Sequence, residues 1–132
     1  MEDTNQPTIF LLEEDDETRR PLVSNLRRDG YRVIIALNEG DALQRVDGGH
    51  VAADLILVNL VGKSVDEALN VGRSIRERAR YDGHTPLVMP EKYGADLEGT
   101  DVNVGGNDWL TYLEDHEQLK NLLARLLGES SR

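Results

Sequence analysis

Short apolar runs alternate along the chain with longer segments in which apolar residues recur every three or four positions. Short runs have the length of buried strands, and the longer spacing is typical of a helix with one buried face. The strand-like runs lie at residues 8–12, 31–36, 53–60, 85–89 and 108–112. Strands that alternate with helices form a mostly parallel sheet with helices on both faces. The pattern therefore predicts an α/β fold with a doubly wound, five-stranded parallel sheet.

Polar residues that can cap helices precede most of the helical segments. The first helix is expected to begin near Thr18, because Pro21 then lies in the first turn, where its missing N–H costs little. Asn38 and Asp115 are the expected N-caps of the second and last helices, and Ser64 with Glu67 has the spacing of a capping box.

One segment interrupts the alternation. Between Pro90 and Asn107 the pattern calls for a helix, yet residues 93–106 contain four glycines. Each glycine in a helix interior costs about 1 kcal/mol relative to alanine. We expect at most a turn or two of helix here, so the fourth helix is short or replaced by a loop.

Composition narrows the class of protein. The 132 residues suit a single domain spanning 1–132, with a core at about 8–128, and the net charge of −10 disfavours nucleic acid and anionic membranes as partners. The chain has no cysteine, so it has neither disulfides nor thiolate chemistry. A polar start and the lack of a long apolar stretch predict a cytoplasmic protein.

Polar side chains follow the expected strands at their carboxyl ends, where open parallel sheets place their sites. Glu14 and Asp15 follow the first strand, Asn59 closes the third, Glu91 follows the fourth, and Tyr112 closes the fifth. The cluster would be acidic, with three carboxylates and one amide.

The chain resembles the receiver domain of two-component response regulators (CheY-like) over nearly its whole length. The resemblance is carried by residues 9–15, 30–31, 54–60 and 85–88. It implies a flavodoxin-like sheet in the order 2-1-3-4-5, and it implies that Glu14 and Asp15 match the family's magnesium-binding acidic pair. In that family an aspartate at the end of strand three accepts phosphate from a histidine kinase.

The other matched positions depart from the family pattern. Asn59 replaces the phosphoacceptor aspartate, Glu91 stands near the hydroxyl position, and Tyr112 and Leu113 replace a lysine and a cis-proline. An amide nitrogen shares its lone pair with its carbonyl, so Asn59 offers no nucleophile for phosphoryl transfer. Without the lysine, one of the cations that neutralise a phosphoryl group is missing. The sequence therefore predicts an atypical pseudo-receiver, with no catalytic residue.

Trp109 occupies the family's switch-aromatic position, three residues before Tyr112. It can be a moving switch or, as we expect, a half-buried ring that closes the sheet or anchors an interface. The family uses its fifth strand and last helix for dimerisation and output. That resemblance makes Tyr93, Trp109, Tyr112 and Leu113 interface candidates, including for a homodimer.

The interpretation is a non-enzymatic signalling domain that acts by binding a protein, such as a histidine kinase or another regulator, without phosphorylation. Two alternatives remain. Glu14, Asp15 and Glu91 can form a divalent-metal or small-ligand sensor, with Glu14 and Asp15 as the metal ligands. The chain can also be a response regulator phosphorylated at a non-standard residue, such as Asp15 or Asp16. No cofactor is required, and magnesium would bind weakly.

Overall fold

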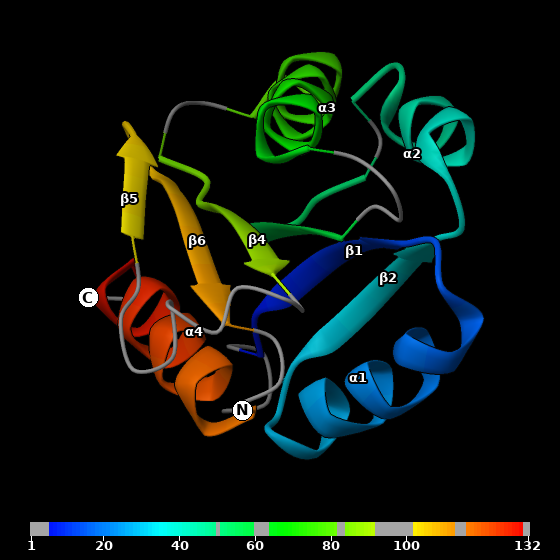
Figure 1. Ribbon diagram of the computed structural model, residues 1–132. Coiled ribbons are helices and arrows are strands. Elements are labelled where there is room, and N and C mark those ends of the chain that lie inside the picture. Colours follow the sequence, from blue (N-terminus) through cyan, green and yellow to red (C-terminus); the bar gives the residue numbers. More distant parts are fainter. Residues whose placement is uncertain are drawn as a thin grey trace.

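The structure, a computed structural model, describes residues 6–49, 51–59, 64–81, 84–91, 102–112 and 116–130. These residues form one six-stranded sheet in the order β2-β1-β3-β4-β6-β5. The strands are β1 (Thr8–Glu13), β2 (Arg32–Ala36), β3 (Leu55–Asn59), β4 (Leu87–Glu91), β5 (Val102–Gly105) and β6 (Asp108–Tyr112). All neighbours pair in parallel except β5 and β6, which are antiparallel (Figure 1). The five parallel strands have the predicted order, so the α/β fold class is confirmed.

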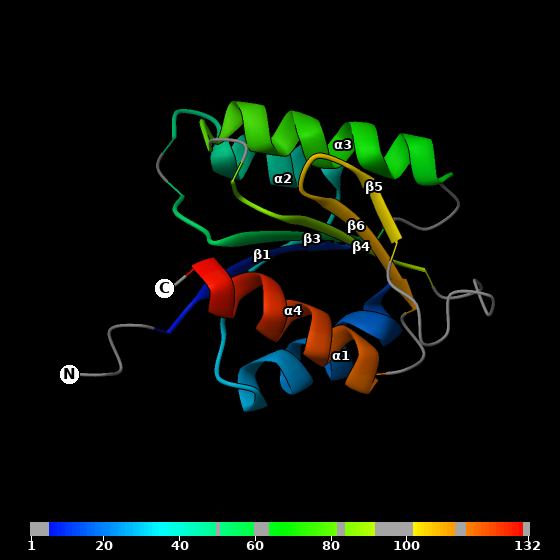
Figure 2. The same ribbon diagram turned by 90° about the vertical axis from the view of Figure 1, so that its left-hand side faces the viewer.

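Two helices cover each face of the sheet (Figure 2). The helices are α1 (Asp16–Arg28), α2 (Glu39–Val46), α3 (Val65–Arg78) and α4 (His116–Ser130). Side chains from α2 and α3 pack on one face around Phe10 and Ile56, and those from α1 and α4 pack on the other around Leu11 and Leu57. Within the described parts of the chain, no helix is long and apolar enough to cross a membrane.

Capping residues fix where the helices begin. Asn38 caps α2, and Ser64 and Glu67 form the expected capping box of α3. The predicted start of α1 near Thr18 is wrong, because Asp15 caps the helix and the first turn begins at Asp16. Pro21 therefore lies inside α1 rather than in its first turn. Its side chain is exposed on the solvent face of the helix.

The glycine-rich segment ends in a strand, whereas the sequence predicted a short helix or a loop at residues 93–106. Residues 102–105 form β5, which turns through Gly106 and Asn107 into β6, with Gly105 opposite Asp108. Gly106 has φ +54°, which the first central residue of a two-residue hairpin loop often needs. Residues 92–101 lie outside the described residues. The sheet therefore has an antiparallel edge strand next to its last parallel strand.

Candidate functional site at the carboxyl ends of the strands

The parallel register brings two pairs of strand-end residues together. Glu13, the last residue of β1, is the register partner of Asn59, the last residue of β3. Glu91 at the end of β4 is likewise the partner of Tyr112 at the end of β6. Because all four strands are parallel, these residues lie at the same end of the sheet, where the sequence predicted a site.

Asn59 is bonded to a buried carboxylate. Its Nδ2 donates a hydrogen bond of 2.8 Å to Oε1 of Glu13, whose side chain is fully buried. The other carboxylate oxygen of Glu13 accepts a bond of 3.1 Å from the backbone N–H of Asp15. Both oxygens of this buried acid therefore have a protein donor, as a buried charge requires. The amide at position 59 satisfies a carboxylate that would otherwise face a second carboxylate in an aspartate-bearing site.

The environment of Glu13 shifts its titration. Burial raises the pKa of the Glu13 carboxyl above its ordinary value, because desolvation penalises the charged form. The hydrogen bonds from Asn59 and from the Asp15 N–H oppose that shift, as does the charge of Arg19. The nearby carboxylate of Asp15 adds to the increase. The charged form of Glu13 is therefore stabilised more by these two hydrogen bonds than by the positive charge of Arg19.

The predicted acidic pair is divided between two environments. Glu14 is half-buried directly after β1. The carboxylate of Asp15 is the N-cap of α1, accepting 2.6 Å from the Thr18 hydroxyl and 3.3 Å from the Glu17 N–H. No group of three His, Asp or Glu side chains within the described ranges is arranged to hold a metal ion.

Several predicted residues cannot be placed at the site by their side chains. Glu91 and Tyr112 are placed as strand residues only, so their side chains lie outside the described part of the structure. Tyr93 and Leu113, two of the interface candidates, lie outside the described residues altogether. Their predicted roles stay predictions.

Trp109 has contacts at the face of its ring and at its indole N–H. It is half-buried against the core beneath α1 and α4, and its indole N–H donates to Oδ1 of Asn107 at 3.2 Å. The guanidinium carbon of Arg125 on α4 lies 5.3 Å from the ring centroid, within the range of a cation–π contact. In this conformation the ring links β6 to α4.

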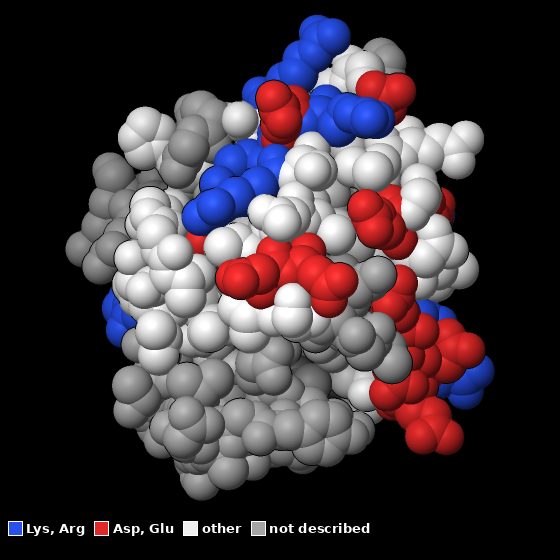
Figure 3. Space-filling model, turned by 45° about the horizontal axis from the view of Figure 1, so that its top comes forward, with Lys and Arg blue, Asp and Glu red and all other residues white. Residues whose placement is uncertain are grey.

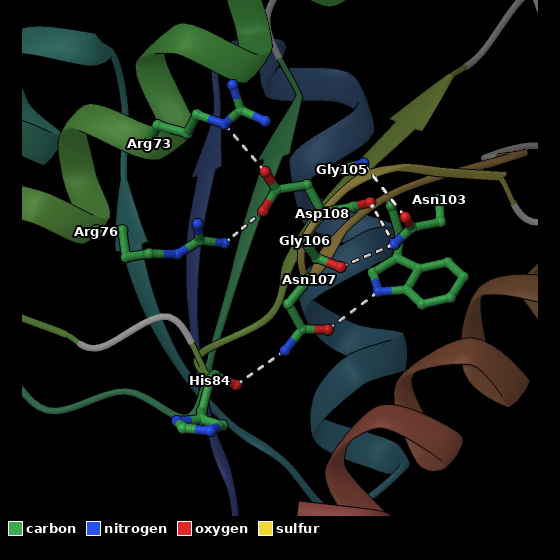
Figure 4. A network of polar contacts seen from close by, with 9 residues as sticks. Arg73, Arg76, His84, Asn103, Gly105, Gly106, Asn107 and Asp108 are labelled. Atoms are coloured by element: carbon green, nitrogen blue, oxygen red, sulfur yellow. Dashed lines mark hydrogen bonds and ion pairs between the residues drawn. The ribbon is translucent and has the colours of Figure 1, made fainter.

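A second buried carboxylate lies at the opposite end of the sheet. Asp108, at the start of β6, is 3% exposed and pairs with Arg73 at 3.0 Å and with Arg76 at 2.5 Å, both on α3 (Figure 4). Arg76 is also mostly buried, and its Nε has no hydrogen-bond partner in the described structure. Asn107 extends the network by donating to the His84 carbonyl at 2.9 Å. The β5–β6 hairpin is thereby fastened to α3 and to the segment before β4.

Glu13 is the site residue that the sequence analysis missed. A signal was present, because residues 9–12 and 55–58 are apolar runs of equal length, closed by Glu13 and Asn59 respectively. Aligning the two runs as parallel neighbours places Glu13, rather than Asp15, opposite Asn59. The partners of Asp108 had no such signal, since Arg73 and Arg76 are 35 and 32 residues away from it.

Comparisons with known proteins match the chain by structure alone. No protein-family model and no curated protein sequence matches it. A response regulator receiver protein from Sinorhizobium medicae is similar with a TM-score of 0.71 and 18% identity, covering 93% of this chain and 95% of that one. The receiver domain of a sensor histidine kinase from Pseudomonas aeruginosa, solved with magnesium in its active site cleft, gives 0.66 and 22%, covering 93% and 98%. A Thermotoga maritima response regulator in complex with magnesium and BeF gives 0.65 and 17%, covering 92% and 99%. The chain therefore has the fold of response regulator receiver domains.

Proposed function

We propose that the chain is a receiver-like signalling domain that works without phosphorylation, by binding a protein in a two-component or phosphorelay-related pathway. The single observation that carries the proposal is the hydrogen bond from Asn59 to the buried Glu13. An amide at this position is no nucleophile, and here its N–H is already used to satisfy a carboxylate. Both oxygens of the Glu13 carboxylate thus accept hydrogen bonds from the protein itself.

Magnesium is not required by this function. The solved relatives from Pseudomonas and Thermotoga contain magnesium. In this chain the carboxylates of Glu13 and Asp15 already accept hydrogen bonds from protein donors. A cation would have to displace those donors, so we expect at most weak binding and assign no step of the function to a metal.

The partner surface that we propose is formed by β6 and α4. Trp109 is the large aromatic side chain at this surface whose position is known, and Arg125 lies over its ring. Aromatic residues that are held in one rotamer make good interface anchors because little side-chain entropy is lost on binding. The partner can be a histidine kinase, another regulator or a second copy of the chain.

Incubation with acetyl phosphate and magnesium, followed by intact-mass measurement, tests the loss of phosphotransfer. The wild-type chain is expected to gain no phosphoryl mass. Asn59→Asp is the matched variant, since it restores the carboxylate alone; we expect no phosphorylation-driven change in its Trp109 fluorescence. An adduct on the wild type at Asp15 or Asp16 would overturn the proposal in favour of a non-standard phosphorylation site.

Protein binding is tested separately by capture from the native cell and mapping on Trp109→Ala. Loss of the captured partner with this variant, but not with Asn70→Ala on the exposed side of α3, is the expected result. Equal binding by both variants would exclude the β6–α4 surface.

A further inference from the structure

A groove lies between α1 and the edge strand β2, away from β6. Its volume is about 390 Å³. The floor is apolar, made by Val23 of α1 and Ile35 of β2. The walls are polar and basic, formed by side chains of α1, namely Arg19, Arg20, Ser24 and Arg27. A molecule that fits here needs an apolar part for the floor and anionic groups for the walls.

Two of the three arginine side chains in this groove have no partner among the described residues. Arg20 and Arg27 are exposed, and neither side chain has a hydrogen-bond or ion-pair partner among the described residues. Arg19 is engaged, since it pairs with Asp16 and donates to the Glu13 carbonyl at 2.8 Å. Guanidinium groups bind carboxylates with two parallel hydrogen bonds. On a chain with net charge −10, two free arginines beside an apolar floor form a local site for an acidic partner.

The groove lies beside the edge of the sheet, because Ile35 belongs to β2. β2 stands at the end of the sheet and pairs only with β1 among the described strands. Figure 1 shows α1 lying beside β2 at this edge. Backbone N–H and C=O groups on the outer side of an edge strand can pair with an extended segment of another chain, and side-chain pockets then supply specificity.

We propose that the groove between α1 and β2 binds an extended acidic segment of a partner protein. The segment adds its backbone to the outer edge of β2, so that every second side chain faces α1. Among those side chains, the apolar ones contact Val23 and Ile35, and the acidic ones pair with Arg20 and Arg27. This inference goes beyond the proposed function, because it identifies a second surface, separate from Trp109 and α4, and the chemistry of what binds there.

The test uses a fluorescently labelled eight-residue peptide in which every second residue is alternately valine and glutamate and the remaining residues are serine, so that valine and glutamate side chains share one face of the strand. The peptide is titrated into the full chain and followed by fluorescence polarisation. Arg20→Glu/Arg27→Glu is expected to weaken the peptide by roughly tenfold or more at low salt. The matched control is Arg78→Glu/Arg80→Glu, with the same charge change at exposed positions in and just after α3, where Figure 3 shows basic side chains gathered. The control should bind within about twofold of the wild type.

Backbone pairing is tested with the same peptide carrying N-methyl groups on every second residue, with one version methylated at the odd positions and one at the even positions, because these two sets of N–H groups point to opposite edges of the strand. Methylation that removes the pairing N–H groups is expected to weaken binding by roughly tenfold, while the other version binds normally. Slower hydrogen exchange of amides in β2 on peptide addition is the accompanying signature.

Three outcomes would overturn the proposal. Equal weakening in the Arg20/Arg27 and Arg78/Arg80 variants would mean attraction by overall charge alone. Indifference to both methylated peptides would exclude strand addition. Displacement of the peptide by inorganic phosphate or free glutamate at equal concentration would mean a simple anion site. Trp109→Ala is expected to leave the peptide affinity unchanged. The result of this experiment is therefore independent of whether the β6–α4 surface binds a partner.

Discussion

Two buried carboxylates at opposite ends of the sheet are stabilised by different means. Glu13, at the carboxyl end of β1, receives an amide N–H and a backbone N–H. Asp108, at the amino end of β6, receives two guanidinium groups. The first is in the expected functional region and the second was not predicted at all. Glu13 is stabilised mainly by neutral donors, whereas Asp108 joins β6 to α3 through two ion pairs.

The Glu13–Asn59 hydrogen bond and the Asp108 ion pairs therefore have different roles. The first satisfies a buried carboxylate at the expected site, and the second, which we call the Asp108 joint, connects β6 to α3. In a receiver-like site, a carboxylate at position 59 would place two acids side by side and call for a cation. Asn59 removes that need. The Asp108 joint instead fixes the hairpin that carries Trp109, and so it positions the proposed interface.

Asp108→Asn should give the largest loss of stability, because it leaves Arg76 mostly buried without its ion-pair partner. We expect the free energy of unfolding to fall by about 3–5 kcal/mol, measured by urea titration. Arg76→Gln should cost more than Arg73→Gln, since the Arg73 side chain is 48% exposed and Arg76 only 16%. Equal, small changes in the free energy of unfolding for all three substitutions would show that these ion pairs do not stabilise the fold.

Asn59→Asp should come next, because the 2.8 Å donor–acceptor pair becomes two carboxylates. At an effective dielectric near 20, charges about 4 Å apart repel by about 4 kcal/mol, so a loss of about 2–4 kcal/mol is expected at neutral pH. Lowering the pH should restore stability by protonating the pair. A variant as stable as the wild type at neutral pH without added cations would contradict the described pairing.

Asn59→Ala should cost less, about 1–2 kcal/mol, because Glu13 loses one donor and keeps the Asp15 N–H. Thermal or urea unfolding at neutral pH measures the change. Asn70→Ala, exposed on α3, is the control and should be close to neutral.

Glu13→Gln should have the smallest effect, visible as a change in pH dependence. The pKa of Glu13 is raised in the folded protein, so its protonation favours folding. That contribution is present below the ordinary carboxyl pKa and is lost as pH rises through the folded-state pKa. The stability of Glu13→Gln relative to wild type should therefore increase from about pH 4 to pH 7. A difference that does not vary with pH would mean that Glu13 is not the titrating group.

The parallel core of the fold could be predicted because its signals are local. A few neighbouring residues are enough to recognise the apolar runs, the cap at Asn38 and the capping box at Ser64. The Glu13–Asn59 pair needed the strand register, and the Asp108 joint needed contacts over more than thirty residues. β5 was missed for another reason: the glycines of residues 93–106 predicted a short helix or a loop, and Gly106-Asn107 was not recognised as a two-residue hairpin loop.

The hairpin also bears on the order in which the chain assembles. The β1–β3 pairing joins residues 46 positions apart, such as Glu13 and Asn59, so it forms only after a long loop closes. β5 and β6 need only the Gly106-Asn107 turn, and hairpins of this kind close in about 1–10 μs. We therefore expect β6 to be already paired with β5 when it adds to β4 during folding.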